Sequence, residues 1–305
     1  MSSKLLHSLS SSHAYSQHTR SIFQSLQSSS TASSFIASNQ ASLFKTLQHK
    51  VLSNTFLGYG QSDFDINGTL DMYPLHLFNE SQISSLLPPS HSSSSPSSSS
   101  SFALLDVGAG AGAVTATLAS TLPAHATVTA TETSPVMAGL LSDRGYEVWG
   151  HDIASPPAHV EQKGESFDLV SMLNVIDRTP RPLSLLRAAH RLLKPNGHVL
   201  LATPLPFRPF FFAANHKGAQ VTGYATKRHG KPVESLALRE GGSWDEQCQY
   251  MLEKALPALG LAPVAFSRLP YVSGGDYFKP EGYVLDDLVV VARKIEPAEP
   301  PAVQR

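Results

Sequence analysis

The chain of 305 residues contains a single cysteine, Cys248, so it can form neither an internal disulfide nor a cysteine-based zinc site. Its 13 histidines include no His-x-His pair and no HExxH array, and we predict no bound metal. No apolar run approaches the length of a transmembrane helix, and none near the N-terminus resembles a secretory signal. These absences favour a reducing compartment. We expect a cytoplasmic location, with the endoplasmic reticulum and the mitochondrion as alternatives.

The chain also has no excess of positive or of negative charge. Lys and Arg number 23 against 24 Asp and Glu, which gives a net charge of −1 and a pI of about 6.9. A near-neutral chain exerts no long-range field on a polyanion, so we predict that nucleic acid is not a partner. The acidic residues are unevenly placed, because the first of them is Asp63.

Serine dominates two segments that lack the apolar residues of a folded core. We predict that residues 1–34 form a disordered tail and that residues 88–101 form a flexible loop. Residues 35–55 carry apolar side chains at helical intervals, which predicts an amphipathic helix. A single folded domain is expected over 56–293, followed by a flexible tail over 294–305.

From Phe102 onward, the pattern alternates between strands and helices. Alternation of this kind predicts an α/β fold with a mostly parallel sheet, helices on both faces and ligands at the carboxyl ends of the strands. We expect seven strands at 104–107, 127–131, 147–150, 167–172, 198–203, 262–268 and 284–293. Helices are expected at 114–122, 135–144, 182–193 and 244–259.

The first of these strands ends in a glycine-rich turn, Asp106-Val107-Gly108-Ala109-Gly110-Ala111-Gly112. Glycines let a ligand approach the backbone, and Glu132 at the end of the next strand can accept the two ribose hydroxyls of a nucleoside. The spacing differs from the dinucleotide pattern G-x-G-x-x-G, and Asp106 would repel a pyrophosphate. A cationic cofactor, S-adenosylmethionine, fits better.

Two later segments support this interpretation. After the third strand, Asp152 can bind the adenine amino group and Ile153 can pack on the ring. Residues 192–200, LLKPNGHVL, form a helix stop, turn and strand start of the kind found in class I methyltransferases, which the whole order resembles. The fold class is therefore predicted to be a class I, Rossmann-like methyltransferase. The alternative is a glycine-rich turn in some other α/β protein.

Polar residues follow the fourth strand, where an acceptor substrate would meet the cofactor methyl group. Asn174 and Asp177 lie at this carboxyl edge and are candidates to hold the acceptor. Asp177 has an equally plausible structural role, in which it caps the next helix and pairs with Arg178.

The chain resembles the DREV-type methyltransferases, a family represented by a protein-histidine N-pros-methyltransferase. The resemblance covers about residues 56–293 and rests on motifs that occur in order. These are FLGYG (56–60), LLDVGAGAG (104–112), ATE (130–132), LNVIDR (173–178), PLSLL (182–186), LPFRPF (205–210), SWDEQ (243–247), RLPY (268–271) and GYVLDD (282–287).

This resemblance implies transfer of a methyl group from S-adenosylmethionine to Nδ1 of histidine in His-x-His motifs of target proteins. It assigns the histidine pocket to Asn174, Asp177, Tyr271 and Tyr283. The expected cofactor residues are Asp106, Gly108, Ala109, Gly110, Glu132, Thr133, Asp152, Ile153 and Asn174. Two departures from the family stand out: Ala111 occupies a position that is often acidic, and the segment 211–238 is long.

The expected chemistry needs no strong base, because neutral imidazole is already a nucleophile. Asp177 or Asn174 would bind the ring N–H and so present the lone pair of Nδ1 to the methyl group. Tyr271 is as readily explained by packing. Asp286-Asp287 either terminate a turn or attract a histidine-rich, partly protonated peptide. The alternative functions are a small-molecule methyltransferase on the same scaffold and a non-catalytic cofactor-binding scaffold.

Overall fold

The computed structural model describes residues 9, 15–26, 32, 34–35, 47, 51, 74–91, 101–155, 164–212, 229–274 and 282–296. Several predictions concern residues outside this set. They are the FLGYG motif, most of the helix expected at 35–55, most of the serine-rich loop at 88–101, residues 213–228 of the long segment, and most of the tail at 294–305.

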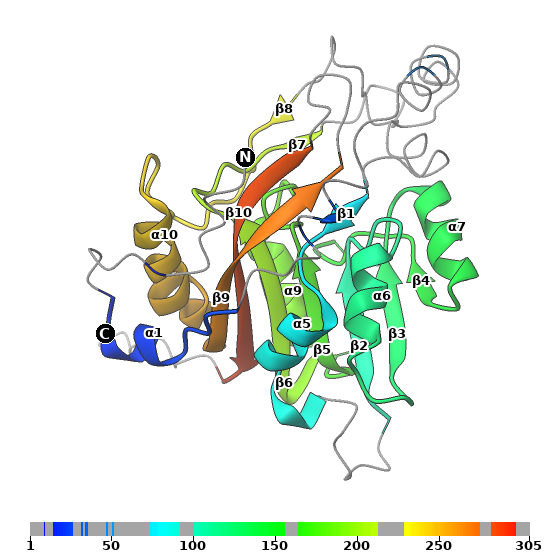
Figure 1. Cartoon of the computed structure of the whole chain (residues 1–305), viewed down its shortest axis with the longest axis horizontal. Helices are drawn as coiled ribbons and strands as arrows, with labels where there is room; N and C mark the ends of the chain where they lie inside the picture. The colour runs from blue at the N-terminus through cyan, green and yellow to red at the C-terminus, as the bar shows by residue number, and fades with distance from the viewer. Residues whose placement is uncertain are drawn as a thin grey trace, which may run out of the picture.

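One sheet of eight strands forms the centre of the molecule, in the order β1-β9-β10-β6-β5-β2-β3-β4 (Figure 1). The pairs β2–β3, β3–β4, β2–β5 and β5–β6 are parallel, whereas β10 is antiparallel to both β6 and β9. The parallel pairs bring the carboxyl ends of β2 to β6 to one edge of the sheet, which is the upper edge in Figure 1.

The seven predicted strands are all present: β2 (Ala103–Val107), β3 (Thr127–Thr131), β4 (Glu147–Trp149), β5 (Phe167–Leu173), β6 (Leu193–Pro204), β9 (Leu261–Ser273) and β10 (Tyr283–Lys294). The eighth, β1 (Leu75–His76), pairs antiparallel with β9. Two residues are too few to show an alternating pattern, so this strand depends on its partner. A separate small sheet joins β7 (Phe211–Phe212) to β8 (His229–Gly230).

The predicted helices are also present. They are α6 (Ala113–Ala119), α7 (Pro135–Asp143), α9 (Pro182–Leu192) and α10 (Trp244–Tyr250), which continues as a π-helix (Met251–Ala255) and a 3-10 helix (Pro257–Leu259). Serine side chains cap the starts of two of them, Ser134 for α7 and Ser243 for α10. Ser243 begins α10 with a capping box. A second capping box at Asn79 begins α5 (Glu80–Leu86), which was not predicted. A 3-10 turn (Pro89–His91) follows it.

The two faces of the sheet bury separate hydrophobic clusters, because side chains alternate along each strand. Leu105 and Val107 of β2 belong to the cluster that α9 and α10 cover. Leu104 belongs to the opposite cluster, which α5 and α6 cover with Ile83 and Leu118. Helices on both faces leave the carboxyl edge as the place where loops can form a site.

The prediction of a disordered tail over 1–34 is wrong for residues 15–26. Residues 17–21 form the helix α1 (Gln17–Ser21), and the buried side chain of Tyr15 donates a hydrogen bond to Asp245. Residues 22–24 pair in parallel with β9: Gln24 N donates to Phe266 O at 2.8 Å, and Phe266 N donates to Ile22 O at 3.0 Å. The serine-rich composition hid this segment, because its stability comes from backbone bonds to a strand far along the chain.

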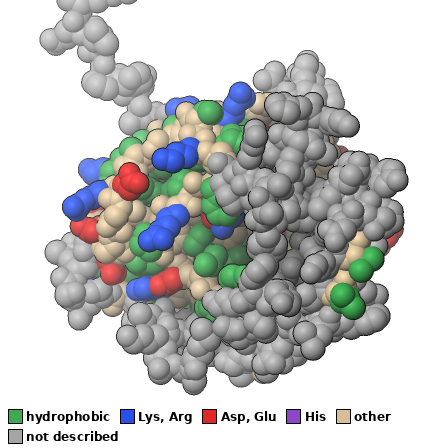
Figure 2. Space-filling view, turned by 90° about the horizontal axis from the view of Figure 1, so that it is seen from above, with side chains coloured by type: hydrophobic (Ala, Val, Ile, Leu, Met, Phe, Trp, Pro, Cys, Tyr) green, Lys and Arg blue, Asp and Glu red, His purple; other side chains and the backbone are tan. Residues whose placement is uncertain are grey.

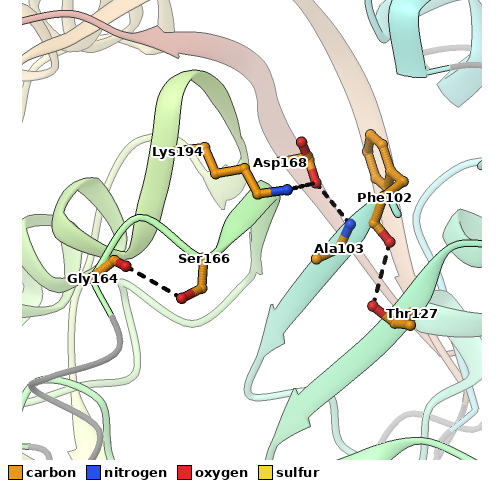
Figure 3. Close-up of polar contacts among 7 residues, drawn as sticks. All are labelled: Phe102, Ala103, Thr127, Gly164, Ser166, Asp168 and Lys194. Atoms are coloured by element: carbon orange, nitrogen blue, oxygen red, sulfur yellow. Dashed lines mark hydrogen bonds and ion pairs between the residues drawn. The ribbon is translucent and has the colours of Figure 1, made fainter. Parts of the chain in front are cut away.

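An ion pair connects strands at the amino edge of the sheet, opposite the expected site. Lys194 Nζ lies 2.7 Å from Asp168 Oδ2, which also accepts a hydrogen bond from Ala103 N at 2.8 Å (Figure 3). This carboxylate joins β5, β6 and the start of β2. Within the described ranges, no helix is long and apolar enough to cross a membrane.

Candidate functional site

The glycine turn after β2 adopts a backbone conformation that requires glycine. Gly108, Gly110 and Gly112 have φ values of +68°, +58° and +80°. A Cβ on Gly108 would lie 2.8 Å from Cγ2 of Val175, whereas a Cβ on Gly110 would meet no atom within 4 Å. The turn therefore contacts the loop after β5 on one side and leaves space beside Gly110.

Glu132 holds this turn in place through its carboxylate. Oε2 accepts a hydrogen bond from Gly110 N at 3.0 Å, while Oε1 accepts from Thr133 N at 2.7 Å and from Ser134 N at 2.9 Å. Each oxygen of a carboxylate has two lone pairs, so these three bonds fill Oε1 and leave one lone pair on Oε2 for the ribose hydroxyls. The expected neighbours Glu132, Gly110 and Thr133 are thus brought together.

Asp106 lies beneath the turn. It is buried and accepts hydrogen bonds from Thr115 Oγ1 and Ser171 Oγ, each at 2.6 Å. Burial raises its pKa to about 6, and the two hydroxyls oppose that shift. At pH 7 the carboxylate is therefore mainly ionised. One of its oxygens accepts from α6 and the other from β5, so both are engaged within the protein.

The two residues expected to contact adenine follow β4 but differ in their surroundings. Ile153 is fully buried in the cluster beneath α9. Asp152 is exposed, and its Oδ1 accepts a hydrogen bond from Ala154 N at 2.8 Å. The exposed carboxylate of Asp152 lies on the same carboxyl edge as Glu132.

Asn174, immediately after β5, begins the second half of the site. Its φ of +60° is left-handed, a region that asparagine tolerates better than most residues, and its N–H donates to Ala202 O at 2.9 Å. Its side-chain oxygen and nitrogen are both buried without a hydrogen-bond partner. Buried amides normally have partners, so this one is available to a ligand.

Asp177 is 1% exposed and has one satisfied oxygen. Oδ2 pairs with the Arg178 guanidinium, whereas Oδ1 is buried with no partner. Burial raises the pKa of Asp177, and Arg178 opposes the shift. The predicted pairing with Arg178 is confirmed, but the predicted helix cap is wrong, because the N-cap of α9 is Arg181 and no side chain caps it. The second carboxylate oxygen, Oδ1, has no partner.

Asp287 is a buried carboxylate that the sequence analysis left as part of a turn; that interpretation is wrong. It lies within β10, opposite Leu269 of β9, and both of its oxygens are buried without a partner. Burial raises its pKa well above the usual range, and Asp177 adds to the shift. The Asn174 amide opposes it, although its geometry falls short of a hydrogen bond. A charged residue inside a strand of apolar residues was the signal in the sequence.

The two tyrosines lie on the same face of the sheet as Asp287. Tyr271 pairs with Leu285, two residues before Asp287, and Tyr283 pairs with Ser273 at the start of β10. Burial, Asp287 and Asp177 together raise the pKa of Tyr271. Both tyrosines are partly exposed, and Tyr271 lies near the buried carboxyl groups of Asp177 and Asp287 whereas Tyr283 lies at the start of β10. We call Asn174, Asp177, Tyr271 and Asp287 the acceptor cluster.

The two halves of the site meet at the contact between Gly108 and Val175. The cofactor residues occupy the carboxyl ends of β2, β3 and β4, and the acceptor cluster occupies the ends of β5 and β9 with part of β10. The residues present fit a nucleoside cofactor, because the turn is open at Gly110 and a carboxylate stands beside it. They also leave a polar acceptor next to that cofactor.

Two bacterial enzymes of known name each match a part of this chain in sequence. Ubiquinone biosynthesis O-methyltransferase from Aliivibrio fischeri (strain MJ11) is 36% identical over 45 residues, which are 15% of this chain and 19% of that protein. The enzyme of the same name from Pseudomonas paraeruginosa (strain DSM 24068 / PA7) is 33% identical over 91 residues, covering 22% and 39%. The chain thus spans well under half the length of these relatives.

Similar solved structures include the Burkholderia thailandensis 1,6-didemethyltoxoflavin-N1-methyltransferase, with a TM-score of 0.39, 20% identity and coverage of 64% of this chain and 71% of that chain. The N-methyltransferase NodS from Bradyrhizobium japonicum WM9 has a TM-score of 0.36, 16% identity and coverage of 63% and 78%. A model of the DREV methyltransferases matches residues 8–294, which include the N-terminal segment that packs on β9. By this match over most of its length, the chain belongs to the DREV methyltransferase family.

Proposed function

We propose that this protein is a protein-histidine N-pros-methyltransferase, which transfers a methyl group from S-adenosylmethionine to Nδ1 of histidine in His-x-His motifs of other proteins. The coarser part of this statement follows from the family: the protein is an S-adenosylmethionine-dependent methyltransferase with the class I fold. The finer part concerns the acceptor atom and is argued from the acceptor cluster.

The observation that supports a histidine acceptor best is the unpartnered Oδ1 of Asp177 beside the unpartnered amide of Asn174. An imidazole has one ring N–H and one ring nitrogen with a lone pair. A carboxylate or amide oxygen that accepts the N–H selects the tautomer whose other nitrogen is nucleophilic. The same contact orients that nitrogen, because the ring is planar and rigid.

The charges of the cluster suit a nitrogen acceptor. S-adenosylmethionine supplies an electrophilic methyl group, and positive charge passes to the acceptor nitrogen during the transfer. Arg178 opposes the rise in the pKa of Asp177 that burial causes, and the ionised form of Asp177 would stabilise an imidazolium. A phenol acceptor must instead lose its proton and become anionic before attack, and two buried carboxylates oppose that step. The cluster thus favours histidine over the phenolic substrates of an O-methyltransferase.

On the cofactor side, Glu132 would accept the ribose hydroxyls, and the backbone at Gly108 to Gly110 would pack against the methionine part. Asp106 would contribute negative charge beneath the sulfonium. Asp152 would reach the adenine amino group from its exposed position. These roles use groups that the structure already orders around the turn.

The direct test incubates the purified full chain with methyl-labelled S-adenosylmethionine and a peptide that contains His-Ala-His. Fragmentation by mass spectrometry then locates the label and distinguishes pros-methylhistidine from the isomer methylated at Nε2. We expect label on Nδ1 of one histidine. Label on Nε2, or only on quinol or other small-molecule acceptors added in parallel, would contradict the proposal.

A substitution connects the activity to the cluster. Asp177→Asn should lower kcat for the peptide by about 100-fold or more, while the Kd for S-adenosylmethionine stays within about threefold. The matched control is Asp143→Asn, the same change at the exposed last residue of α7, which should leave both values unchanged. Equal losses of kcat and cofactor affinity in Asp177→Asn would move Asp177 to the cofactor half of the site.

A further inference from the structure

The near-zero net charge of the chain conceals a strongly basic segment. Residues 178–233 contain ten Lys and Arg and no Asp or Glu, although the whole chain carries a net charge of −1. This segment begins next to Asp177 and ends just before Glu234. It includes the loop after β5 and the two segments that form the small sheet β7–β8.

The fold returns two parts of this segment, around Phe210 and around Val233, to the neighbourhood of the acceptor cluster, whereas Lys194 lies at the opposite, amino edge of the sheet. Phe210 N donates to Asp177 O at 2.9 Å, and the Arg178 guanidinium lies 4.1 Å from the Phe210 ring centroid. Val233 N donates to Pro180 O at 2.9 Å. Segments that are far apart in the sequence are therefore tied to the loop that carries Asp177.

Three exposed cations lie within two residues of Pro180, Phe210 or Val233, which form these hydrogen bonds. The cations are Arg181, Arg208 and Lys231. Arg208 and Lys231 form no ion pair with any described residue, and Arg181 donates a hydrogen bond to Ser155 Oγ at 2.8 Å. The nearest following acid, Glu234, is engaged with Ser184 of α9. We call these three cations the basic rim. In Figure 2, Lys and Arg side chains stand out on the described part of the upper face.

The acceptor cluster and its surroundings thus differ in chemistry, because buried carboxyl groups inside can accept an N–H and exposed cations outside attract negative charge. The cluster contains the buried carboxylates of Asp177 and Asp287, and the rim outside carries exposed cations. A ligand that matches both must place an N–H-bearing or cationic group inside and negative charge outside. A histidine flanked by acidic residues has this arrangement.

We propose that the basic rim binds acidic side chains that flank the acceptor histidine, so that the preferred substrates carry Asp or Glu on both sides of the motif. This inference rests on the proposed function, because it concerns the substrate of the same site. It narrows that function from histidine motifs in general to those in acidic segments. Nucleic acid fits less well, because its phosphates would meet the two buried carboxylates and the chain as a whole exerts no attractive field.

The test compares two peptides with the same His-Ala-His core, one flanked by three Glu on each side and the other by Gln at the same positions. For the protein as it stands, we expect KM for the Glu-flanked peptide to be about tenfold lower at low ionic strength, with kcat within about twofold. The difference in KM should shrink to about twofold or less in 0.5 M salt. At this ionic strength the Debye length is only about 4 Å, so exposed ion pairs are largely screened.

The double variant Arg208→Glu/Lys231→Glu should remove the preference by raising KM for the Glu-flanked peptide alone. Its matched control is Arg293→Glu, the same charge reversal at an exposed position near the far end of β10, about 30 Å along the strand from Tyr283. The control should keep the preference. Equal KM values for the two peptides, or an equal loss in the control, would overturn the proposal.

Fluorescence anisotropy with the same peptides, dye-labelled, separates this inference from the proposed function. Tighter binding of the Glu-flanked peptide that depends on the rim, with no methyl transfer to histidine, would support the rim and contradict the proposed function. Methylation of both peptides with no difference in binding would do the reverse. Stronger competition by single-stranded RNA than by an acidic peptide without histidine would overturn the rim's assignment to acidic protein segments.

Discussion

Two buried histidines at the amino edge should make the stability of this protein sensitive to mild acid. The rings of His91 and His198 lie 4.7 Å apart with an interplanar angle of 84°, and His91 also contacts the Phe102 ring edge-on at 5.1 Å. Nδ1 of each histidine is buried without a hydrogen-bond partner. A second proton on either ring would therefore be buried beside another imidazole.

The magnitude follows from the pKa values. Burial lowers the pKa of both histidines to about 4; Asp168 opposes the shift at His91, whereas His91 and Arg293 reinforce it at His198. In the unfolded chain an ordinary histidine has a pKa of about 6.5, so on acidification the unfolded state binds protons first. These histidines therefore leave the free energy of unfolding unchanged above about pH 6.5, and they lower it as the pH falls toward 4. At pH 4.5 the loss is about 2.5 kcal/mol for each histidine, or about 5 kcal/mol for the pair.

The assay is urea unfolding at pH 7.5 and pH 4.5, applied to the protein and to the double variant His91→Phe/His198→Phe. Phenylalanine preserves an aromatic pair and cannot titrate, so the variant should lose about 5 kcal/mol less than the protein between the two pH values. His18→Phe, at an exposed position of α1, is the control and should behave like the protein. If the protein and the double variant lose the same stability, the pair is not the acid-sensitive element.

Three further predictions concern the cofactor, the acceptor and the N-terminal segment. Glu132→Ala should raise the Kd for S-adenosylmethionine by about 10-fold or more with a smaller change in kcat, measured by calorimetry and initial rates. The substitution removes the hydrogen bond to Gly110 in the turn and two to the backbone of Thr133 and Ser134, as well as the ribose contact; an unchanged Kd would refute the assignment. The rate of methylation should fall as the pH drops through about 6.5, since protonated imidazole has no lone pair, and a rate that rises toward pH 5 would contradict a histidine acceptor. Leu26→Ala should lower the free energy of unfolding by about 2 to 3 kcal/mol, measured by urea unfolding, because the side chain is buried. Val233→Ala, at an exposed position, is the control and should lower it by less than about 0.5 kcal/mol. Equal effects would show that residues 15–26 do not stabilise the fold.

Most of the central sheet could be predicted because its signals are local. The strand β3 was predicted with its observed limits, and β2, β4 and β5 agree to within a residue, since each is a short apolar run between a helix and a turn. The glycine turn and Glu132 also lie close in sequence to the strands that orient them. What could not be predicted were β1 and the pairing of residues 22–24 with β9, since these depend on partners about 200 or more residues away.

The acceptor half of the site was only partly predictable. Asn174 and Asp177 were predicted from their place after the fourth strand, and Tyr271 from a family resemblance, but neither argument says which atoms have partners. The structure shows that Asp177 has one paired and one unpaired oxygen, and it adds Asp287 to the same cluster. The sequence around Asp287 is equally compatible with a turn, because burial depends on which strands lie on either side.

The sequence alone determined the order of strands and helices, the glycine turn after β2 and the overall balance of charge, because each depends on residues that are neighbours in the chain or on simple composition. Only the tertiary structure decided where the charges stand. It buries Asp287 between β9 and β6, places His91 against His198, and ties Phe210 and Val233 to the loop that carries Asp177. The physical reason is that burial and electrostatic coupling depend on distance in space, and a parallel sheet with crossover connections brings together residues that the sequence holds far apart.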